Sequence, residues 1–142
     1  MSSYNELANV TRIMLERDLD RHRSNVNLSK QIAGELAQID AMRAAAQSDS
    51  GAINARQMLG ADVLWQGWLL RKRADIQRRA AKARAQELET LDIARLAFAR
   101  SQATEALVQK DRQEKLRKQL LAEAETIDTL GHLRRALRSE EE

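Results

Sequence analysis

The sequence contains no cysteine and no proline, and its 142 residues include only five glycines, two tryptophans, one tyrosine and one phenylalanine. The absence of cysteine excludes a disulfide framework, thiolate catalysis and cysteine-ligated metal sites. A β-sandwich or barrel needs turn residues at regular intervals, which so few glycines without proline do not supply. The longest uncharged apolar run, residues 63–70, is far shorter than the roughly 20 apolar residues of a membrane-spanning helix. No secretory signal is visible either, so we expect a cytoplasmic protein that does not insert into the membrane.

Residues that favour helices are abundant instead. Alanine, leucine, arginine, glutamine and glutamate are frequent, and 32% of the residues are charged, a composition typical of long helices and coiled coils. The one cluster of turn and capping residues lies at 47–51, where serine, aspartate and glycine can end one helix and begin the next. We therefore predict a single all-α domain over 1–142, with a first helix over about 3–46, a loop over about 47–52 and a second helix over about 53–138, whose start can shift to near Gly60.

Apolar residues in both predicted helices recur at steps of three and four, the spacing of a coiled-coil seam. They are Leu28, Ile32, Leu36, Ile39 and Ala46 in the first helix, and Trp65, Leu69, Ile76, Ala80 and Ala83 in the second, with Leu88, Leu91 and Phe98 expected to continue the line. A stripe this narrow cannot bury itself, so each helix needs a partner. The predicted fold is two long helices forming an antiparallel coiled-coil hairpin, with the second helix longer than the first.

The difference in helix length predicts an overhang. If the turn is centred on Gly51, residue n of the first helix faces roughly residue 102 minus n of the second. Tyr4 then lies opposite Phe98, and the hairpin leaves the residues after about 100 uncovered. This uncovered part carries its own heptad stripe, formed by Leu116, Leu120, Ile127, Leu130 and Leu137. We expect a helix of another protein to cover it, while pairing with a second copy or folding back remain alternatives.

Positive charge is concentrated in the second helix. Residues 71–118 hold 14 basic and 7 acidic side chains, although the whole chain has a net charge of only +3. Such a face is either simply solvated or attracts an acidic partner. Trp68 stands at the edge of the predicted seam, towards Lys72 and Arg79, where its ring either covers the hairpin or forms part of a binding hot spot.

No motif in the chain indicates catalysis. The sequence has no glycine-rich phosphate loop and no glycine-flanked nucleophile. The pairs Asp18 with His22, and Asp128 with His132, stand four residues apart, and pairing on an exposed helix surface explains both better than a shared metal ion. We therefore expect no enzyme activity, no catalytic residue, no metal site and no cofactor.

The motif Trp65-Gln66-Gly67-Trp68-Leu69, followed by Lys72 and Ile76, resembles the FliJ-like proteins of the bacterial flagellar export apparatus. The run 94–100, with Glu105 and the basic segment 110–118, is also similar to the second helix of that family, which shares an architecture with the stalk proteins of virulence-type type III secretion. The resemblance implies a coiled-coil stalk that contacts the hexameric export ATPase and the cytoplasmic part of the export-gate membrane protein, and in some members export chaperones. It also implies a cytoplasmic protein held peripherally at the membrane export machinery.

The resemblance further implies a gate-binding line that runs through Trp68, Lys72, Asp75 and Arg79. The family more typically has an aliphatic and a small residue where Lys72 and Asp75 stand. Two other functions stay open: a structural coiled coil that self-associates through residues 100–138, and a nucleic-acid-binding helix that uses the basic residues of 71–84. The candidate partner-binding residues are Trp65, Trp68, Leu69, Lys72, Asp75, Ile76, Arg79, Leu116, Leu120, Ile127 and Leu130.

Overall fold

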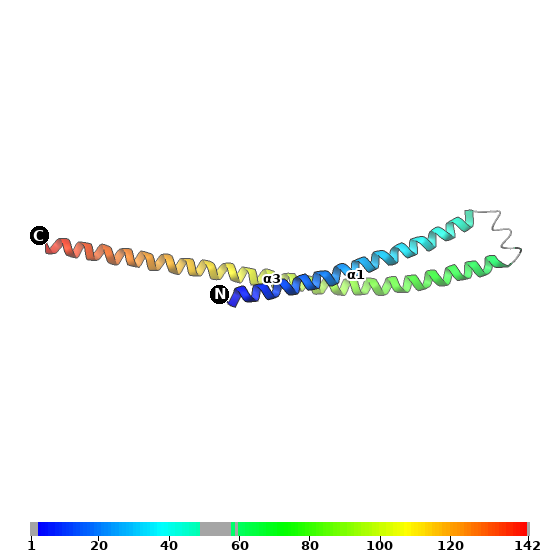
Figure 1. The fold of residues 1–142 in the computed structure, drawn as a ribbon, viewed down its shortest axis with the longest axis horizontal. Coiled ribbons are helices and arrows are strands. Elements are labelled where there is room, and N and C mark those ends of the chain that lie inside the picture. The colour runs from blue at the N-terminus through cyan, green and yellow to red at the C-terminus, as the bar shows by residue number, and fades with distance from the viewer. Residues whose placement is uncertain (1–2, 49–57, 59, 142) are drawn as a thin grey trace. The chain divides into compact units, whose positions relative to one another are not determined.

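The structure, a computed structural model, describes residues 3–48, 58 and 60–141 and is all-α over these residues (Figure 1). Helix α1 spans Ser3–Ser48 and the longer helix α3 spans Ala61–Glu140, so the expected pair of packed helices of unequal length is confirmed. Gln47 and Ser48, expected in the loop, belong to α1. Residues 53–57, expected at the start of the second helix, lie outside the described residues. Gly60 directly precedes α3 with φ of 71°, a left-handed conformation that glycine adopts without steric cost.

The chain divides into two units. The central unit comprises Met14–Ala97, and the terminal unit comprises Met1–Ile13 together with Phe98–Glu142. Each unit contains a stretch of α1 and an antiparallel stretch of α3. In the central unit the direction follows from the ion pairs, since Glu35 contacts Arg79 while the later Asp40 contacts the earlier Arg73.

The apolar core lies in the central unit. Ile32 and Ile39 of α1 pack against Leu69, Ile76 and Ala83 of α3, and Leu36, Trp65 and Ala80 flank this cluster. These residues come from the two predicted stripes, so this part of the seam is confirmed, whereas Leu28, expected in the same stripe, is 39% exposed. Seven-residue spacing returns each of them to the same side of its helix, where the branched side chains interdigitate. Each fully buried leucine or isoleucine contributes about 1.5–3 kcal/mol relative to an exposed one.

Further along α3 the seam departs from the prediction. Leu88 and Phe98 are 50% and 54% exposed, whereas Ala94 and Ala97 are buried. The reason is geometric, because heptad steps from Ala83 lead to positions 90, 94 and 97. Leu88 and Phe98 therefore fall outside the contact line despite their hydrophobicity.

The register of the hairpin also corrects the prediction. Tyr4, expected opposite Phe98, instead shares a shallow pocket with Lys110 and Glu114 in the terminal unit. The register is shifted by about twelve residues because α3 begins at Ala61, later than a short turn near residue 51 would require. The uncovered part of α3 consequently begins near residue 112 and not near residue 100.

Candidate partner-binding surfaces

The uncovered part of α3 lies in the terminal unit (Figure 1, orange to red). From Arg112 to Glu141 every residue except Gly131 is exposed. The predicted stripe residues Leu116, Leu120 and Ile127 are 57%, 56% and 67% exposed, and Leu130 and Leu137 are equally open. None of them is covered by another described part of the chain. We name the stripe formed by Leu116, Leu120, Ile127, Leu130 and Leu137 the terminal stripe.

The terminal stripe is wider than the heptad pattern suggested. Leu133 is 56% exposed as well and stands three residues after Leu130 and four before Leu137, so it lies beside the stripe on the helix surface. Leu121 is 54% exposed but lies about 100° round the helix from Leu120, outside the stripe. Glu123 and Arg134 occupy the two heptad places that lack an apolar residue. The sequence could have identified Leu133, because it stands at i+3 and i−4 from two stripe residues. The face is therefore mainly apolar, with one acidic and one basic position.

Where α1 and α3 meet in the terminal unit, the contact is polar. Thr11 Oγ1 and Thr104 Oγ1 lie 2.8 Å apart, and each hydroxyl also contacts a backbone carbonyl of its own helix, that of Ala8 or of Ser101. Two hydroxyl protons serve these three contacts, so only two of the contacts are hydrogen bonds at any moment. This pair was not predictable from the sequence, because small polar residues give no hydrophobic periodicity.

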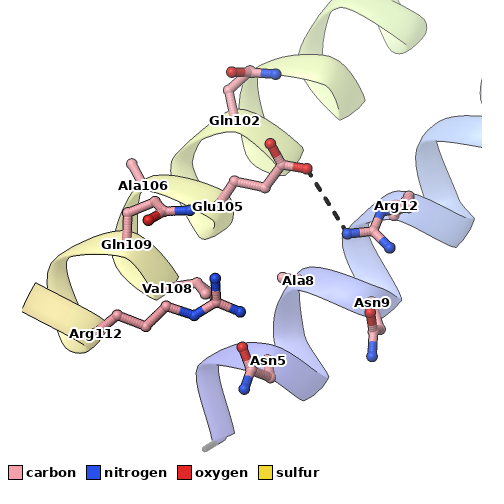
Figure 2. A pocket seen from close by; sticks show the side chains of 10 residues that line it. All are labelled: Asn5, Ala8, Asn9, Arg12, Gln102, Glu105, Ala106, Val108, Gln109 and Arg112. Atoms are coloured by element: carbon pink, nitrogen blue, oxygen red, sulfur yellow. Dashed lines mark ion pairs between the residues drawn. The ribbon is translucent and has the colours of Figure 1, made fainter. Parts of the chain in front are cut away.

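A groove beside these threonines is lined mainly by polar side chains (Figure 2). The α1 side presents Asn5, Asn9 and Arg12, and the Arg12 guanidinium lies 3.9 Å from the Glu105 carboxylate of α3. Both ionic side chains are about half exposed, so their attraction is worth little in water. The α3 side presents Gln102, Glu105, Ala106, Val108, Gln109 and Arg112. With so few apolar groups, this groove contributes little hydrophobic stabilisation.

Trp65 and Trp68 form a stacked pair at the other end of the seam. Their ring centroids lie 5.2 Å apart and the ring planes are inclined by 18°. Trp65 packs against the apolar core, while Trp68 is 42% exposed, in agreement with its predicted place at the edge of the seam. The indole Nε1 of Trp65 is buried without a hydrogen-bond partner, which costs free energy. Together with Ala61 and Leu64, the two rings line an open apolar hollow.

The charged candidates beside the tryptophans differ in their contacts, and Arg79 is the one that joins the two helices among the described residues. The Arg79 guanidinium donates to both carboxylate oxygens of Glu35, at 2.7 and 3.4 Å. This bond, assisted by the charge of Lys72, lowers the pKa of Glu35 below its ordinary value. Asp75 lies 3.9 Å from Arg78 on the same helix. Arg79 therefore links α3 to α1, whereas Lys72 has no ion pair with a described residue.

The structure separates the candidates predicted from sequence into three groups. Leu69 and Ile76 are 0% and 1% exposed, so their side chains are used within the core and offer no surface to a partner. Trp65 and Arg79 also make contacts inside the hairpin. The exposed candidates without a contact between the helices are Trp68, Lys72 and Asp75 in the central unit, and Leu116, Leu120, Ile127 and Leu130 in the terminal unit; Arg79 is exposed too but is paired with Glu35.

The histidine and aspartate pair of α1 differs from its expected exposed arrangement. Asp18 is only 4% exposed and accepts a hydrogen bond from Arg17 Nε at 3.3 Å. His22 Nδ1 lies 3.0 Å from Thr90 Oγ1 of α3, and Asn25 donates to the same hydroxyl at 3.2 Å. These contacts make this section of the seam polar. Across the described ranges, no group of three histidine, aspartate or glutamate residues is arranged to hold a metal ion.

No helix within the described part of the chain is both long enough and apolar enough to cross a membrane. Comparison of the chain with protein-family models, with curated proteins and with solved structures gave no match.

Proposed function

We propose that this chain is a non-enzymatic coiled-coil stalk or adaptor of a bacterial flagellar, type III protein-export apparatus. In this role it engages the export ATPase hexamer and the cytoplasmic part of the export-gate membrane protein. Export chaperones, which some members of the resembled family bind, are further candidate partners. The protein acts in the cytoplasm, peripherally associated with the membrane export machinery. The proposal rests on the sequence resemblance to FliJ-like proteins and on the helical hairpin with one longer helix.

The single observation that carries the proposal is the exposed terminal stripe. Leu116, Leu120 and Ile127 stand in heptad register with more than half of each residue in contact with water. An apolar heptad stripe is stabilised only when a second surface covers it. Because no described residue of the chain does so, the covering surface comes from another molecule. A helical rod presenting such a stripe suits the inner surface of a protein ring.

A stalk of this kind needs no reactive groups of its own. Suppose that the subunits of the ring can adopt two arrangements, and that one of them binds the stripe more tightly. Binding of the stripe then increases the population of that arrangement. The size of the shift is limited by the difference in affinity between the two arrangements. The expected effect on the ATPase is therefore a change in hexamer formation or in turnover, with no new reaction.

The test is reconstitution with the candidate export ATPase encoded in the same genome. We expect ATP hydrolysis or hexamer formation to rise when this protein is added, and the rise to disappear with the double variant Leu116→Asp and Leu120→Asp. The matched control is Ala122→Asp with Thr129→Asp, which adds the same charge on the opposite side of the same helix. An unchanged ATPase in the presence of the folded wild-type protein contradicts the proposal.

A self-associating coiled coil is the second candidate, because the terminal stripe would equally accept a second copy. Light scattering behind a sizing column separates the two functions. A stalk is monomeric over the accessible concentration range, whereas self-association gives a mass that rises with concentration and falls in the Leu116→Asp and Leu120→Asp variant.

A further inference from the structure

A second regular stripe runs along α3 in the central unit, on the side away from the core. Its members follow steps of four and three and carry no charge: Val63, Gly67, Leu70, Ala74, Gln77 and Ala81. At ~100° per residue they point roughly 100–180° away from the direction of Leu69 and Ile76. Val63 is 76% exposed and Leu70 is 54% exposed, so the chain does not cover them. We name these six residues the outer stripe.

The outer stripe alternates small and large side chains. Gly67, Ala74 and Ala81 recur every seven residues, and Val63 and Leu70 occupy the alternate heptad positions. Small residues allow another helix axis to approach closely, and the larger side chains then fill the space on either side. An antiparallel or parallel helix can therefore pack along about five turns of α3.

Gly67 supports the same interpretation from a different direction. Glycine is among the poorest residues in a helix interior, so its presence there calls for a reason. Apart from the adjacent backbone of α3, no atom of the described residues lies within 4 Å of the place where a Cβ atom of residue 67 would stand. The fold itself therefore does not require glycine at this position, but a helix approaching from outside would.

The charge around the outer stripe is one-sided. Arg71 and Arg78 lie along one flank, and Lys82 and Arg84 stand at its C-terminal end. Arg71, Lys82 and Arg84 make no ion pair with any residue that the structure describes, and Arg78 reaches only the Asp75 carboxylate at 3.9 Å. The charge is therefore not neutralised within the hairpin, in contrast to that of Arg79 on the side facing α1.

We propose that the outer stripe is the docking surface for an amphipathic helix of a partner protein with glutamate and aspartate beside its apolar face. The small residues set the close approach, and the flanking arginines select acidic flanks. A second copy of this chain does not fit, because it would bring Arg71 and Arg78 beside the same cations of the copy. A lipid surface fits poorly as well, since glycine, alanine and glutamine offer it little apolar area.

The test uses three synthetic 28-residue helices that share a leucine and alanine apolar face and differ only in the flanking residues, which are glutamate, glutamine or lysine. Binding of each labelled peptide to the full chain is measured by fluorescence anisotropy at low and high salt. We expect the glutamate peptide to bind at least tenfold more tightly than the glutamine peptide, with affinity falling as salt rises, and the lysine peptide not to bind.

Two variants locate the contact. Leu70→Gln removes an exposed apolar side chain of the outer stripe, and Gly67→Leu blocks the close approach; each is expected to weaken the glutamate peptide at least tenfold. Gly67→Leu has open space around it, so thermal melting should show an intact fold. Leu96→Gln is the matched control, since Leu96 is a similarly exposed leucine of the central unit outside the outer stripe, and binding should stay unchanged.

Several results overturn the proposal. Equal binding of the glutamate and lysine peptides contradicts the proposed preference for acidic flanks, and so does the absence of binding by the glutamate peptide. If Leu96→Gln loses as much binding as Leu70→Gln, then the outer stripe is not the peptide-binding surface. Binding of phosphatidylserine vesicles or of a 20-base-pair DNA duplex, without binding of the glutamate peptide, assigns the basic residues to a lipid or a nucleic acid instead.

Discussion

Ile76 and Leu69 are the two large side chains that the hairpin encloses completely. Both stand at heptad positions of α3, and both meet branched residues of α1 from the opposite side. In a two-helix unit the core is a single row of such contacts, so each residue carries a large share of the stability. The exposed leucines of the same helix carry none of it.

Truncation of Ile76 should therefore be severe. We expect Ile76→Ala to lower the free energy of unfolding by about 2–5 kcal/mol, because it removes buried methyl groups and leaves a cavity. Urea denaturation followed by circular dichroism measures the change. Leu96→Ala, at a position 52% exposed, should lie within about 0.5 kcal/mol of wild type. Equal losses in the two variants would mean that Ile76 is not in the core.

Glu35 and Asp40 make the stability of the hairpin depend on pH. The hydrogen bond from Arg79 lowers the pKa of Glu35 from 4.5, and the hydrogen bond from Arg73 lowers the pKa of Asp40 from 3.8. A lowered pKa in the folded state means that the stabilisation is present above these ordinary values and is lost as the pH falls through the lowered ones. Both carboxylates are solvent-accessible, so the effect is modest and weakens with salt.

We expect the free energy of unfolding to fall as the pH is lowered below about 4.5, and to fall less in the double variant Glu35→Gln and Asp40→Asn. Denaturation curves at several pH values provide the comparison. Asp20→Asn is the control, because the partner of Asp20, Arg23, belongs to the same helix. A double variant with the wild-type pH slope would show that these two bridges do not couple protonation to folding.

At the scale of the element, Gly34 inside α1 and Gly60 directly before α3 differ in whether the backbone requires glycine. Gly34 lies inside α1 with no atom within 4 Å of its absent Cβ, whereas Gly60 adopts φ of 71° directly before α3. Helix interiors favour alanine over glycine, while the left-handed conformation disfavours alanine. The same substitution should therefore have opposite effects at the two positions.

We expect Gly34→Ala to stabilise the protein by about 1 kcal/mol and Gly60→Ala to destabilise it by about 1 kcal/mol. Thermal melting at equal protein concentration measures both. If Gly34→Ala also melts below wild type, then the added methyl group meets a neighbour, and the space beside Gly34 is not open.

The elements also show how far sequence alone can lead. The seam from Ile32 to Ile39 was predictable because large apolar side chains repeat every seven residues. The polar seam at Thr11 and Thr104 was not, since small polar residues give no such signal. Leu88 was misassigned because hydrophobicity alone does not establish burial. The helix register was missed because the start of α3 at Ala61 is not encoded in any periodicity.

The candidate surfaces divide in the same way. The terminal stripe was predictable from Leu116 and Leu120, since a heptad pattern with two polar places continues beyond the part of α3 that the shorter first helix can cover. The outer stripe was not, because Gly67, Ala74 and Gln77 are ordinary surface residues in a sequence. Their significance depends on knowing which side of α3 the core occupies.

At the scale of the whole molecule, the two units differ in what holds them. Branched aliphatic residues fill the core of the central unit, whereas the described helix contact of the terminal unit consists of Ala8, the two threonines and a polar groove. The contacts described for the part of α3 after Glu114 all lie within the helix itself, such as the Lys115–Asp111 ion pair at 2.9 Å and the Gln119–Glu123 hydrogen bond at 3.3 Å. A helix without tertiary contacts is only marginally stable in water.

Amide hydrogen exchange should therefore follow the two units. We expect the amides of residues 112–140 to exchange at least tenfold faster than those around Leu69 and Ile76, since opening the former exposes no buried core. Mass spectrometry of peptic fragments after deuterium labelling resolves the two regions. Addition of a partner that covers the terminal stripe should slow exchange there selectively. Equal protection of both regions in the isolated protein would show that the stripe is already covered.

The threonine contact between Thr11 and Thr104 has a mechanical consequence. Separation of the first three turns of α1 from α3 exposes little apolar surface to solvent. Water can form hydrogen bonds with both threonine hydroxyls in place of their mutual contact, so the cost in free energy is small. Fraying of the N-terminal turns of α1 would lengthen the uncovered part of α3 by several turns. The core contacts of Ile32 and Ile39 in the central unit would stay intact. A partner helix that binds along α3 in the terminal unit would therefore displace these turns of α1 at little cost in free energy.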